Sequence, residues 1–289
     1  MQLLLYQLYS GQMFFSAALA IGATALLALA GALERSQIWR SIASVVALSA
    51  IGAAALCGVP MPLAQAFVVI PLTLAFALFG ITAPKRRRVT LASLALLSTL
   101  ASVALEIRWQ RRTPFPMPRP ARLIVLGDSL SSGGFGETTA WPELLARDSG
   151  ATLVNLSLPG ETAVSAAWNL LPDLPSAATG DVVIVALGGN DMLEGRPARD
   201  VEAALERILE ASRAEGRRSI VMLELPVVPG KWRIGAIQRR LAKKHGVTLV
   251  PRRVIAKALL TPGCTFDGIH LTQRGHDLLA REIAHSLTW

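Results

Sequence analysis

The chain lacks the features that mark several common classes of protein. It has only two cysteines in 289 residues, Cys57 and Cys264, and neither has a second Cys or a His at the spacing of a metal ligand. We therefore expect no disulfide between them and no metal site. Residues 1–12 contain no Lys or Arg. A secretory signal peptide begins with a basic region, so we expect no cleaved signal peptide here.

Charge is absent from long stretches of the N-terminal part. Four apolar runs contain no charged residue, and each is close to the ~20 residues that a helix needs to cross a bilayer. They are Met13–Leu33, Ser41–Val59, Leu63–Ile81 and Val89–Leu105. The pattern predicts a transmembrane region of about four helices within residues 1–110. Gln65 and Pro71 interrupt the third run, so three full spans with a re-entrant segment remain an alternative.

The net charge of +9 is concentrated in the same region. Residues 1–120 contain ten Lys/Arg and two Asp/Glu, whereas residues 121–289 contain nineteen and eighteen. A nearly neutral C-terminal part does not attract phosphates, so we expect no nucleic-acid partner. The expected partner of the N-terminal part is the membrane bilayer. Ionisable residues are absent from the apolar runs away from their ends, which favours anchoring over transport.

Orientation follows from the basic loops. The cluster Lys85–Arg88 separates the third and fourth runs, and clusters of this kind are typical of the cytoplasmic side. With both ends of the chain outside, six basic residues lie on the cytoplasmic side; the opposite arrangement places five there. The two counts hardly differ, so the orientation rests on the compact cluster, which favours an integral membrane protein whose C-terminal domain lies outside the cytoplasm. In a bacterium we would expect it in the inner membrane, with this domain on the periplasmic side.

Residues 111–121 separate the two parts. Four prolines within residues 113–120 favour extended polyproline II structure. The segment is predicted to be a semi-rigid linker between the transmembrane region and a domain of residues 122–289.

The C-terminal domain alternates strand and helix patterns. Short aliphatic runs typical of buried parallel strands occur at 123–126, 153–156, 182–187, 220–225 and 247–250. Helical patterns lie at about 139–148, 161–171, 198–215, 232–245 and 273–287. This order predicts an α/β fold, a three-layer α/β/α sandwich with a parallel sheet. Ligands of such sheets bind beyond the carboxyl ends of the strands.

Polar and glycine motifs stand at those ends. The first strand ends in "GDS" at Gly127–Ser129, and the second is followed by "SLPGET", which contains Gly160. The third ends in "GGND" with Asn190, and "DGIH" at Asp267–His270 follows the last strand. We expect the four motifs to form one pocket.

These motifs resemble those of the GDSL (SGNH) hydrolase family, whose signature residues are Ser, Gly, Asn and His. They match as Ser129 in "GDSLS", Gly160 in "NLSLPGET", Asn190 in "GGND" and His270 in "DGIHLTQRGH". The similarity extends from about Arg122 to the end and is greatest to the bacterial periplasmic thioesterase/lysophospholipase type. The four apolar runs are not part of it.

The resemblance implies a role for each residue. Ser129 is the nucleophile, His270 the base and Asp267 the group that orients the imidazole. The oxyanion hole is formed by the N–H groups of Ser129 and Gly160 and the side-chain amide of Asn190. This mechanism needs no metal and no cofactor.

The expected activity is that of a membrane-anchored serine esterase. It would hydrolyse acyl esters or thioesters through an acyl-enzyme, with lysophospholipids or other lipids as candidate substrates. Two alternatives remain open: an O-acetylesterase or acetyltransferase of an envelope polysaccharide, and a non-catalytic membrane module with an inert hydrolase-like domain.

Other residues in or near the motifs are expected to have structural roles and no part in catalysis. Asp128 and Asp191 are expected to orient their loops through local backbone hydrogen bonds. His276 and His285 are expected to be packing or solvated residues. The glycines of "SSGGFG", residues 131–136, are expected to form a rim of the pocket.

Overall fold

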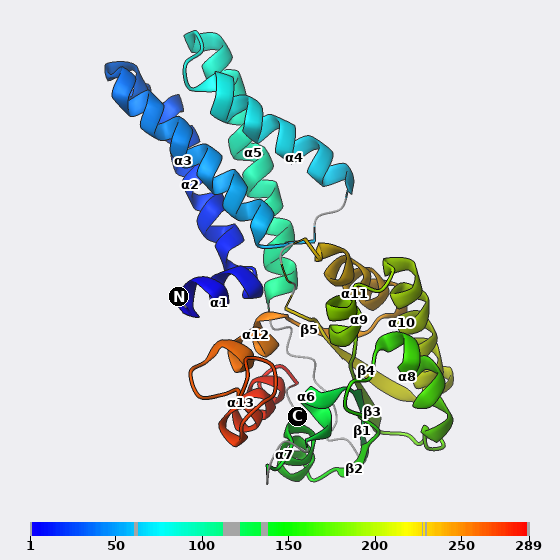
Figure 1. Cartoon of the computed structure of the whole chain (residues 1–289). Coiled ribbons are helices and arrows are strands. Elements are labelled where there is room, and N and C mark those ends of the chain that lie inside the picture. Colours follow the sequence, from blue (N-terminus) through cyan, green and yellow to red (C-terminus); the bar gives the residue numbers. More distant parts are fainter. Residues whose placement is uncertain are drawn as a thin grey trace. The chain divides into compact units, whose positions relative to one another are not determined.

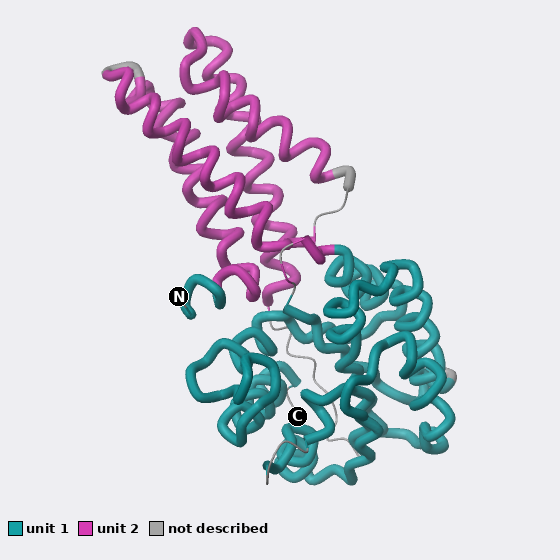
Figure 2. Tube along the Cα trace, viewed as in Figure 1, with its two compact units in different colours: residues 1–6, 112–227, 233–289 teal, residues 7–111, 228–232 magenta. Residues whose placement is uncertain are grey.

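The computed structural model describes residues 2–60, 63–111, 122–133, 138–226, 228 and 230–287. The chain forms two compact units, which Figure 2 distinguishes by colour. The helical unit consists of Gln7–Arg111 with Val228–Trp232, and the α/β unit consists of Met1–Tyr6, Arg112–Val227 and Arg233–Trp289. Most of the predicted linker, residues 112–121, and residues 134–136 of the predicted rim lie outside the described residues.

Long apolar helices follow a short helix, α1 (Gln2–Ser10), which the sequence pattern did not indicate. They are α2 (Gln12–Leu29), α3 (Gln37–Leu56), α4 (Leu63–Ala75) and α5 (Lys85–Gln110) (Figure 1). A 3-10 turn, η1 (Ala32–Arg35), connects α2 to α3. Three of the helices, α2, α3 and α5, are long and apolar enough to cross a membrane.

The third apolar run does not form one regular α-helix. Pro71 lies inside α4, and the helix changes to a π turn, η2 (Phe76–Gly80). Proline has no N–H to donate to the preceding turn. Two residues on, the Thr73 hydroxyl donates to the carbonyl of Val69 at 2.8 Å. The apolar helix Gln65–Gly80 is shorter than the other three.

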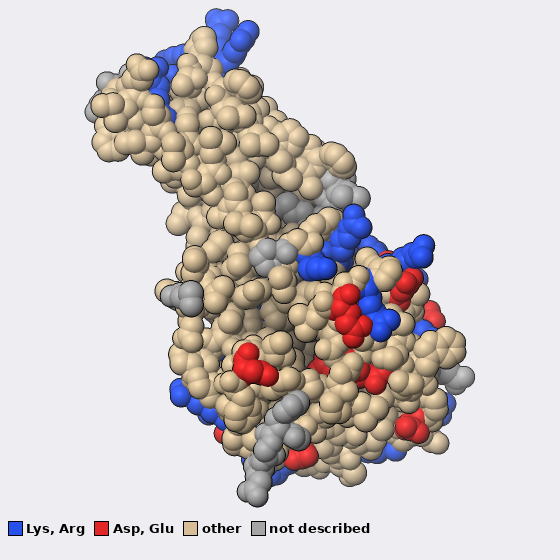
Figure 3. Space-filling model, in the orientation of Figure 1, with Lys and Arg blue, Asp and Glu red and all other residues tan. Residues whose placement is uncertain are grey.

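The helices pack through small residues and expose large apolar ones. Ala25, Ala47 and Ala95 are fully buried, whereas the side chains of Leu19 and Phe67 are 75% and 76% exposed. This is the pattern expected of a bundle that is solvated by lipid. Figure 3 shows few charged residues over the visible helices, apart from a basic group at one end of the unit. The exposed residues Lys85, Arg86 and Arg87 begin α5.

The α/β unit contains one five-stranded parallel sheet. Its strands are β1 (Arg122–Gly127), β2 (Thr152–Asn155), β3 (Asp181–Ala186), β4 (Arg218–Leu223) and β5 (Thr248–Val250). The spatial order is β2-β1-β3-β4-β5, and every neighbouring pair is parallel. The register pairs Gly127 of β1 with Ala186 of β3. The predicted fold class is confirmed.

Helices cover both faces of the sheet (Figure 1). On one side α7 (Trp141–Ser149) packs on α13 (Gln273–Ala284), which also contacts α12 (Arg253–Leu260). On the other, α8 (Ala163–Asn169) packs on α10 (Ala198–Arg213), and α10 is joined to α11 (Trp232–His245) by an Arg240–Glu202 hydrogen bond. Helix α12 was missed by the sequence pattern, as were the short helices α6 (Ser129–Ser132) and α9 (Gly189–Glu194). Short 3-10 turns, η3 (Leu171–Asp173) and η4 (Ala214–Gly216), follow α8 and α10.

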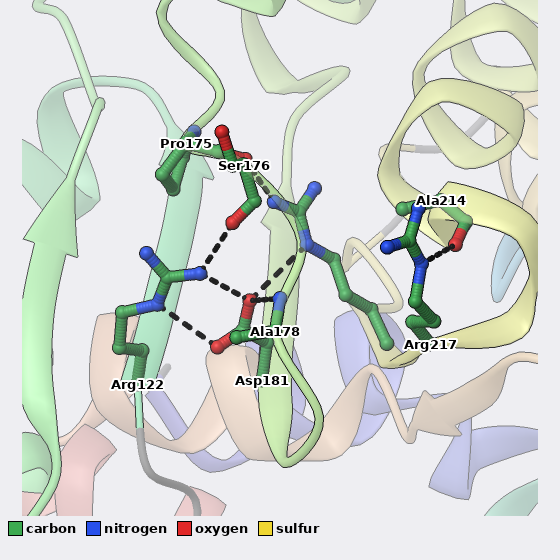
Figure 4. Close-up of polar contacts among 8 residues, drawn as sticks. Arg122, Pro175, Ser176, Ala178, Asp181, Ala214 and Arg217 are labelled. Atoms are coloured by element: carbon green, nitrogen blue, oxygen red, sulfur yellow. Dashed lines mark hydrogen bonds and ion pairs between the residues drawn. The ribbon is translucent and has the colours of Figure 1, made fainter.

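An ion cluster joins the amino ends of three strands (Figure 4). Asp181, the buried first residue of β3, accepts from Arg122 of β1 through Nε at 2.9 Å and Nη2 at 2.6 Å. It also accepts from Nε of Arg218 on β4 at 3.4 Å and from the N–H of Ala178 at 2.9 Å. Burial raises the pKa of Asp181, but the bonds from Arg122, Ala178 and Arg218 outweigh burial and leave the pKa below its usual value. The carboxylate form is therefore favoured in the folded protein.

We expect Asp181→Asn to lower the free energy of unfolding by about 3 kcal/mol, because it leaves two arginines at a buried site without their counter-charge. Denaturant unfolding of the detergent-solubilised full chain measures this. Since folding lowers the pKa of Asp181, its contribution is present above about pH 4 and is lost as pH falls below that. The variant should therefore lose less stability in acid than the wild type does.

The exposed pair Arg199–Asp200 provides the control. Asp200→Asn should change the free energy of unfolding by no more than about 0.5 kcal/mol, as most surface substitutions do. Equal stabilities of Asp181→Asn and the wild type at neutral pH would contradict the role of the cluster.

Candidate active site

The strand order identifies one point of the sheet edge as the expected site. From β1 the chain continues outward to β2, whereas β3, on the other side of β1, begins the run to β5. Ligands of doubly wound sheets bind at such a reversal, beyond the carboxyl ends of the two central strands. Ser129 follows β1, and Asn190 follows β3. Both predicted residues therefore lie at the reversal.

Ser129 occupies a tight turn from strand to helix. It is the first residue of α6, and Asp128 caps this helix by accepting from the N–H of Leu130 at 3.0 Å. The carbonyl of Asp128 accepts from the N–H of Ser131, also at 3.0 Å. A Cβ on Gly127 would lie 2.6 Å from the Ser131 hydroxyl oxygen, so the turn requires glycine there. Such a turn presents a serine at the edge of a sheet, and Ser129 is partly exposed.

The two other expected oxyanion donors lie on loops that are joined to each other. Beyond β2 the chain stays beside β1, since the N–H of Leu158 donates to the carbonyl of Gly127 at 3.2 Å. Gly160 then has a φ of 75°, which favours glycine. Nδ2 of Asn190 donates to the carbonyl of Glu161 at 2.8 Å. An amide nitrogen has two hydrogens, so the second remains for another acceptor.

Asp267 and His270 are in direct contact. Oδ2 of Asp267 lies 2.6 Å from Nδ1 of His270, and Oδ1 accepts from the N–H groups of Ile269 at 2.9 Å and His270 at 2.8 Å. The backbone bond from His270 is the largest cause of a lowered pKa of Asp267, followed by the side-chain bond and the bond from Ile269. A carboxylate at Nδ1 favours the tautomer with its lone pair on Nε2, the form that a general base requires.

The pKa of Asp128, which directly follows β1, depends on burial and on the charge of His270. Asp128 is buried, and burial raises its pKa to about 6. The Leu130 hydrogen bond and the charge of His270 act in the opposite direction, and the charge of Asp191 raises the pKa further. A Cβ on Gly189 would lie 3.3 Å from Oδ2 of Asp128. The carboxyl ends of β1 and β3 thus meet around this buried acid, within the field of His270.

Asp128 and Asp191 behave differently from each other. The expectation for Asp128 is confirmed, because its bond to Leu130 is local. The expectation for Asp191 is wrong: its fully buried carboxylate accepts from the N–H groups of Ala163 at 2.6 Å and Val164 at 3.3 Å, in the first turn of α8. A helix N-terminus favours an anion, which explains the choice of partner. Asp191 therefore ties the loop after β3 to the loop that carries Gly160.

The remaining histidines have no part in the site geometry. His276 is buried, its Nδ1 accepts from the N–H of Trp141 at 3.3 Å, and burial lowers its pKa. It is the packing residue that was expected. His285 is exposed at the end of α13. Within the described residues, Cys57 and Cys264 are not joined by a disulfide.

Two groups near the sheet edge were not found from the sequence. One is the Glu161 carbonyl, which no side-chain pattern can reveal. The other is Glu224, a fully buried acid directly after β4 that accepts from Nε of Arg239 at 2.6 Å and from the N–H of Arg252 at 3.1 Å. A glutamate within the apolar run "VMLELP" was the available signal for it.

One group of metal-type ligands lies within the described residues: Glu206, Glu210 and His245, on α10 and α11. Lys244 already forms an ion pair with Glu206, and His245 contacts the same carboxylate at 3.2 Å. None of these residues belongs to the four motifs.

The C-terminal part is similar to known esterases. The profile of the GDSL-like Lipase/Acylhydrolase family matches residues 125–278. Thioesterase 1/protease 1/lysophospholipase L1 of Escherichia coli (strain K12) is 33% identical over 172 residues, 57% of this chain and 82% of that protein. Arylesterase of Vibrio mimicus is 29% identical over 180 residues, 57% of this chain and 88% of that protein. The solved esterase EstA from Pseudoalteromonas sp. shares the fold, with a TM-score of 0.50, 21% identity, and coverage of 57% of this chain and 96% of that one.

The raised pKa of Asp128 generates a prediction about stability. Its pKa is about 6 in the folded protein and about 3.9 in an unfolded chain, so its contribution to stability is present below about pH 4 and is lost as pH rises through 6. Asp128→Asn keeps an acceptor for Leu130 and removes the charge. Relative to the wild type, we expect the variant to gain about 3 kcal/mol at pH 8. Denaturant unfolding at a series of pH values measures the difference.

The gain should disappear below pH 4, where the wild-type carboxyl is already neutral. A difference that stays constant between pH 4 and 8 would show that the charge of Asp128 is not its cause.

Proposed function

Because the chain belongs to the GDSL-like lipase/acylhydrolase family, it is an SGNH-type hydrolase of ester bonds, and we propose that it acts as a membrane-anchored serine esterase through an acyl-enzyme. The observation that carries the mechanism is the 2.6 Å contact between Asp267 and Nδ1 of His270. The charge of His270 lowers the pKa of Asp128, the residue before Ser129, which supports a position of the imidazole near the serine. A carboxylate–imidazole pair next to a serine would activate its hydroxyl.

The proposed reaction has two halves. The Ser129 hydroxyl attacks the carbonyl carbon of the ester while Nε2 of His270 accepts its proton. The resulting imidazolium is stabilised by Asp267, and it returns the proton to the departing alcohol or thiol. Water then attacks the acyl-enzyme with the same histidine as base, which releases the acid and restores Ser129. In both halves the oxyanion would accept from the N–H groups of Ser129 and Gly160 and from Asn190.

The Asn190 amide is suited to this role because it is held in place before substrate binds. Its bond to the Glu161 carbonyl fixes the orientation of the amide plane. The first N–H groups of a helix have no acceptor within the helix, so that of Ser129 is available at the start of α6. Donors that are oriented in advance need no reorganisation as the oxyanion forms.

Exposed apolar side chains support an acyl substrate. Each of these side chains lies within three residues of one of the site residues. They are Leu158 (46% exposed), Leu193 (60%), Phe266 (62%) and Ile269 (42%). We propose that they contact the acyl group of an oxygen ester or thioester. Lipids, including lysophospholipids, are the proposed substrate class, in keeping with the names of the E. coli relative.

Anchoring is proposed from α2, α3 and α5, which are long and apolar enough to span a bilayer. The exposed Lys85, Arg86 and Arg87 begin α5, and such clusters are retained on the cytoplasmic side. The end of α5 at Gln110 would then lie outside the cytoplasm. We therefore propose an extracytoplasmic, periplasmic location for the hydrolase, and this holds whether or not α4 crosses the membrane.

Orientation is tested with reporters fused after Trp289. Alkaline phosphatase, which is active only outside the cytoplasm, should be active there, and a green fluorescent protein that folds only in the cytoplasm should stay dark. Fusions after Pro84, before α5, provide the matched control and should give the reverse result. Fluorescence of the Trp289 fusion would contradict the proposed orientation.

Activity is tested on p-nitrophenyl esters of increasing acyl length with the purified full chain. We expect hydrolysis of medium and long acyl esters, together with labelling by a fluorophosphonate. Both should be lost in Ser129→Ala, since the nucleophile is removed, whereas Ser132→Ala, at the last residue of α6, should keep both activities.

Two results would overturn this function. Cleavage of the acetyl ester alone would favour a polysaccharide O-acetylesterase. A folded wild-type protein that is neither labelled nor active would favour an inert module.

A further inference from the structure

The helical unit contains a cavity that anchoring alone does not require. It lies between α2, α3, α4 and α5 and has a volume of about 330 Å³. That volume lies within the range of small-molecule sites, about 300–1,000 Å³. Most of its lining is apolar and includes Phe14, Ile21, Ile51, Ala54 and Ile70. Water does not readily fill a space with such walls, so an apolar occupant is favoured.

One side chain of the lining lacks a partner. Thr99 of α5 is 6% exposed, and its hydroxyl oxygen has no hydrogen bond to the described part of the chain. Thr73, which also lines the cavity, donates to the carbonyls of Val69 and Ile70. A buried hydroxyl without a partner is costly. Thr99 is therefore a donor available to a polar atom of whatever occupies the cavity.

A second, smaller cavity adjoins the first and is more polar. The two share Phe14, Val59 and Ser102, and the smaller one also contacts Gln65 and Glu106. Within this cluster Nε2 of Gln65 donates to the hydroxyl of Ser102 at 3.0 Å. The carboxylate of Glu106 accepts from Nε2 of Gln110 at 2.9 Å, and Glu106 is 3% exposed.

We propose that the two cavities bind one single-chain ester lipid, with its acyl chain in the larger cavity and its polar end in the smaller one. The Thr99 hydroxyl donates to the ester carbonyl. A free fatty acid fits less well because its carboxylate would approach Glu106, whereas an ester with a glycerol hydroxyl has no such charge. The proposal rests on the membrane location of the helices and not on the chemistry of Ser129. One helix would be enough for anchoring, so the proposal gives the additional helices a function.

The test uses the full chain in nanodiscs, with Ser129→Ala to prevent hydrolysis of the probe. The probe is a monoacylglycerol that carries a diazirine in the middle of its acyl chain. After irradiation, mass spectrometry should locate the label on residues that line the larger cavity and are shielded from bulk lipid, such as Ala18 and Ile21. Unlabelled monoacylglycerol should compete for this labelling. Labels confined to lipid-facing residues such as Leu97 would overturn the proposal.

Two matched substitutions separate the cavity from the outer surface. Ala54→Phe places a ring in the cavity, and Ala101→Phe places the same ring on an exposed position of α5. We expect a tenfold or greater loss of cavity labelling in the first and little change in the second. Equal labelling of both variants would contradict the site. In a Ser129 background both should retain hydrolysis of p-nitrophenyl acetate, which confirms that they are folded.

The role of Thr99 is tested with an ether-linked probe of the same length, which lacks the ester carbonyl. The ester probe should bind the Ser129→Ala chain about threefold to tenfold more tightly than the ether probe, the effect of one hydrogen bond. Adding Thr99→Val, which keeps the volume of the side chain, should abolish that preference. A preference that survives Thr99→Val would refute the proposed contact.

Discussion

The pairing of β1 with β3 is the constraint on which the site depends. Because Gly127 and Ala186 are level in the register, the turns that follow them leave the sheet at the same height. This places Ser129 and Asn190 on adjacent turns, although 61 positions separate them in the sequence. The connection to β2 passes outward from β1, so the edge above these two strands is left uncovered by a crossover. Both features come from the strand order and not from any single side chain.

Polar side chains then hold the segments at this edge. Asn190 and Asp191 are neighbours, yet they bond to different parts of the loop after β2: the Glu161 carbonyl and the first turn of α8. One bond holds the side-chain amide of Asn190, and the other holds the first turn of α8. Asp267 does the same for its own loop by binding both the imidazole and two backbone N–H groups.

The two edges of the sheet use their acids in opposite ways. At the amino edge Asp181 is matched by two arginines, and its lowered pKa reflects net stabilisation of the charge. At the carboxyl edge Asp128 is buried without such a partner, and its raised pKa reflects an unfavourable charge. Perturbed pKa values of this kind are common at functional sites.

The sequence alone determined the fold class, the strands and the identity of the motif residues. Buried parallel strands are continuous apolar runs, which is why their limits could be placed within about two residues. Apolar runs long enough to cross a membrane are recognised in the same way. The helix α12 was missed because its eight residues form little more than two turns, too few to establish a helical pattern directly after β5. Only the tertiary structure decided the strand order, the long-range partner of Asp191, the Glu161 carbonyl beside Asn190, the shortened α4 and the cavity with its unpartnered Thr99. Each of these depends on contacts between segments distant in the chain, and local patterns of hydrophobicity carry no record of such contacts.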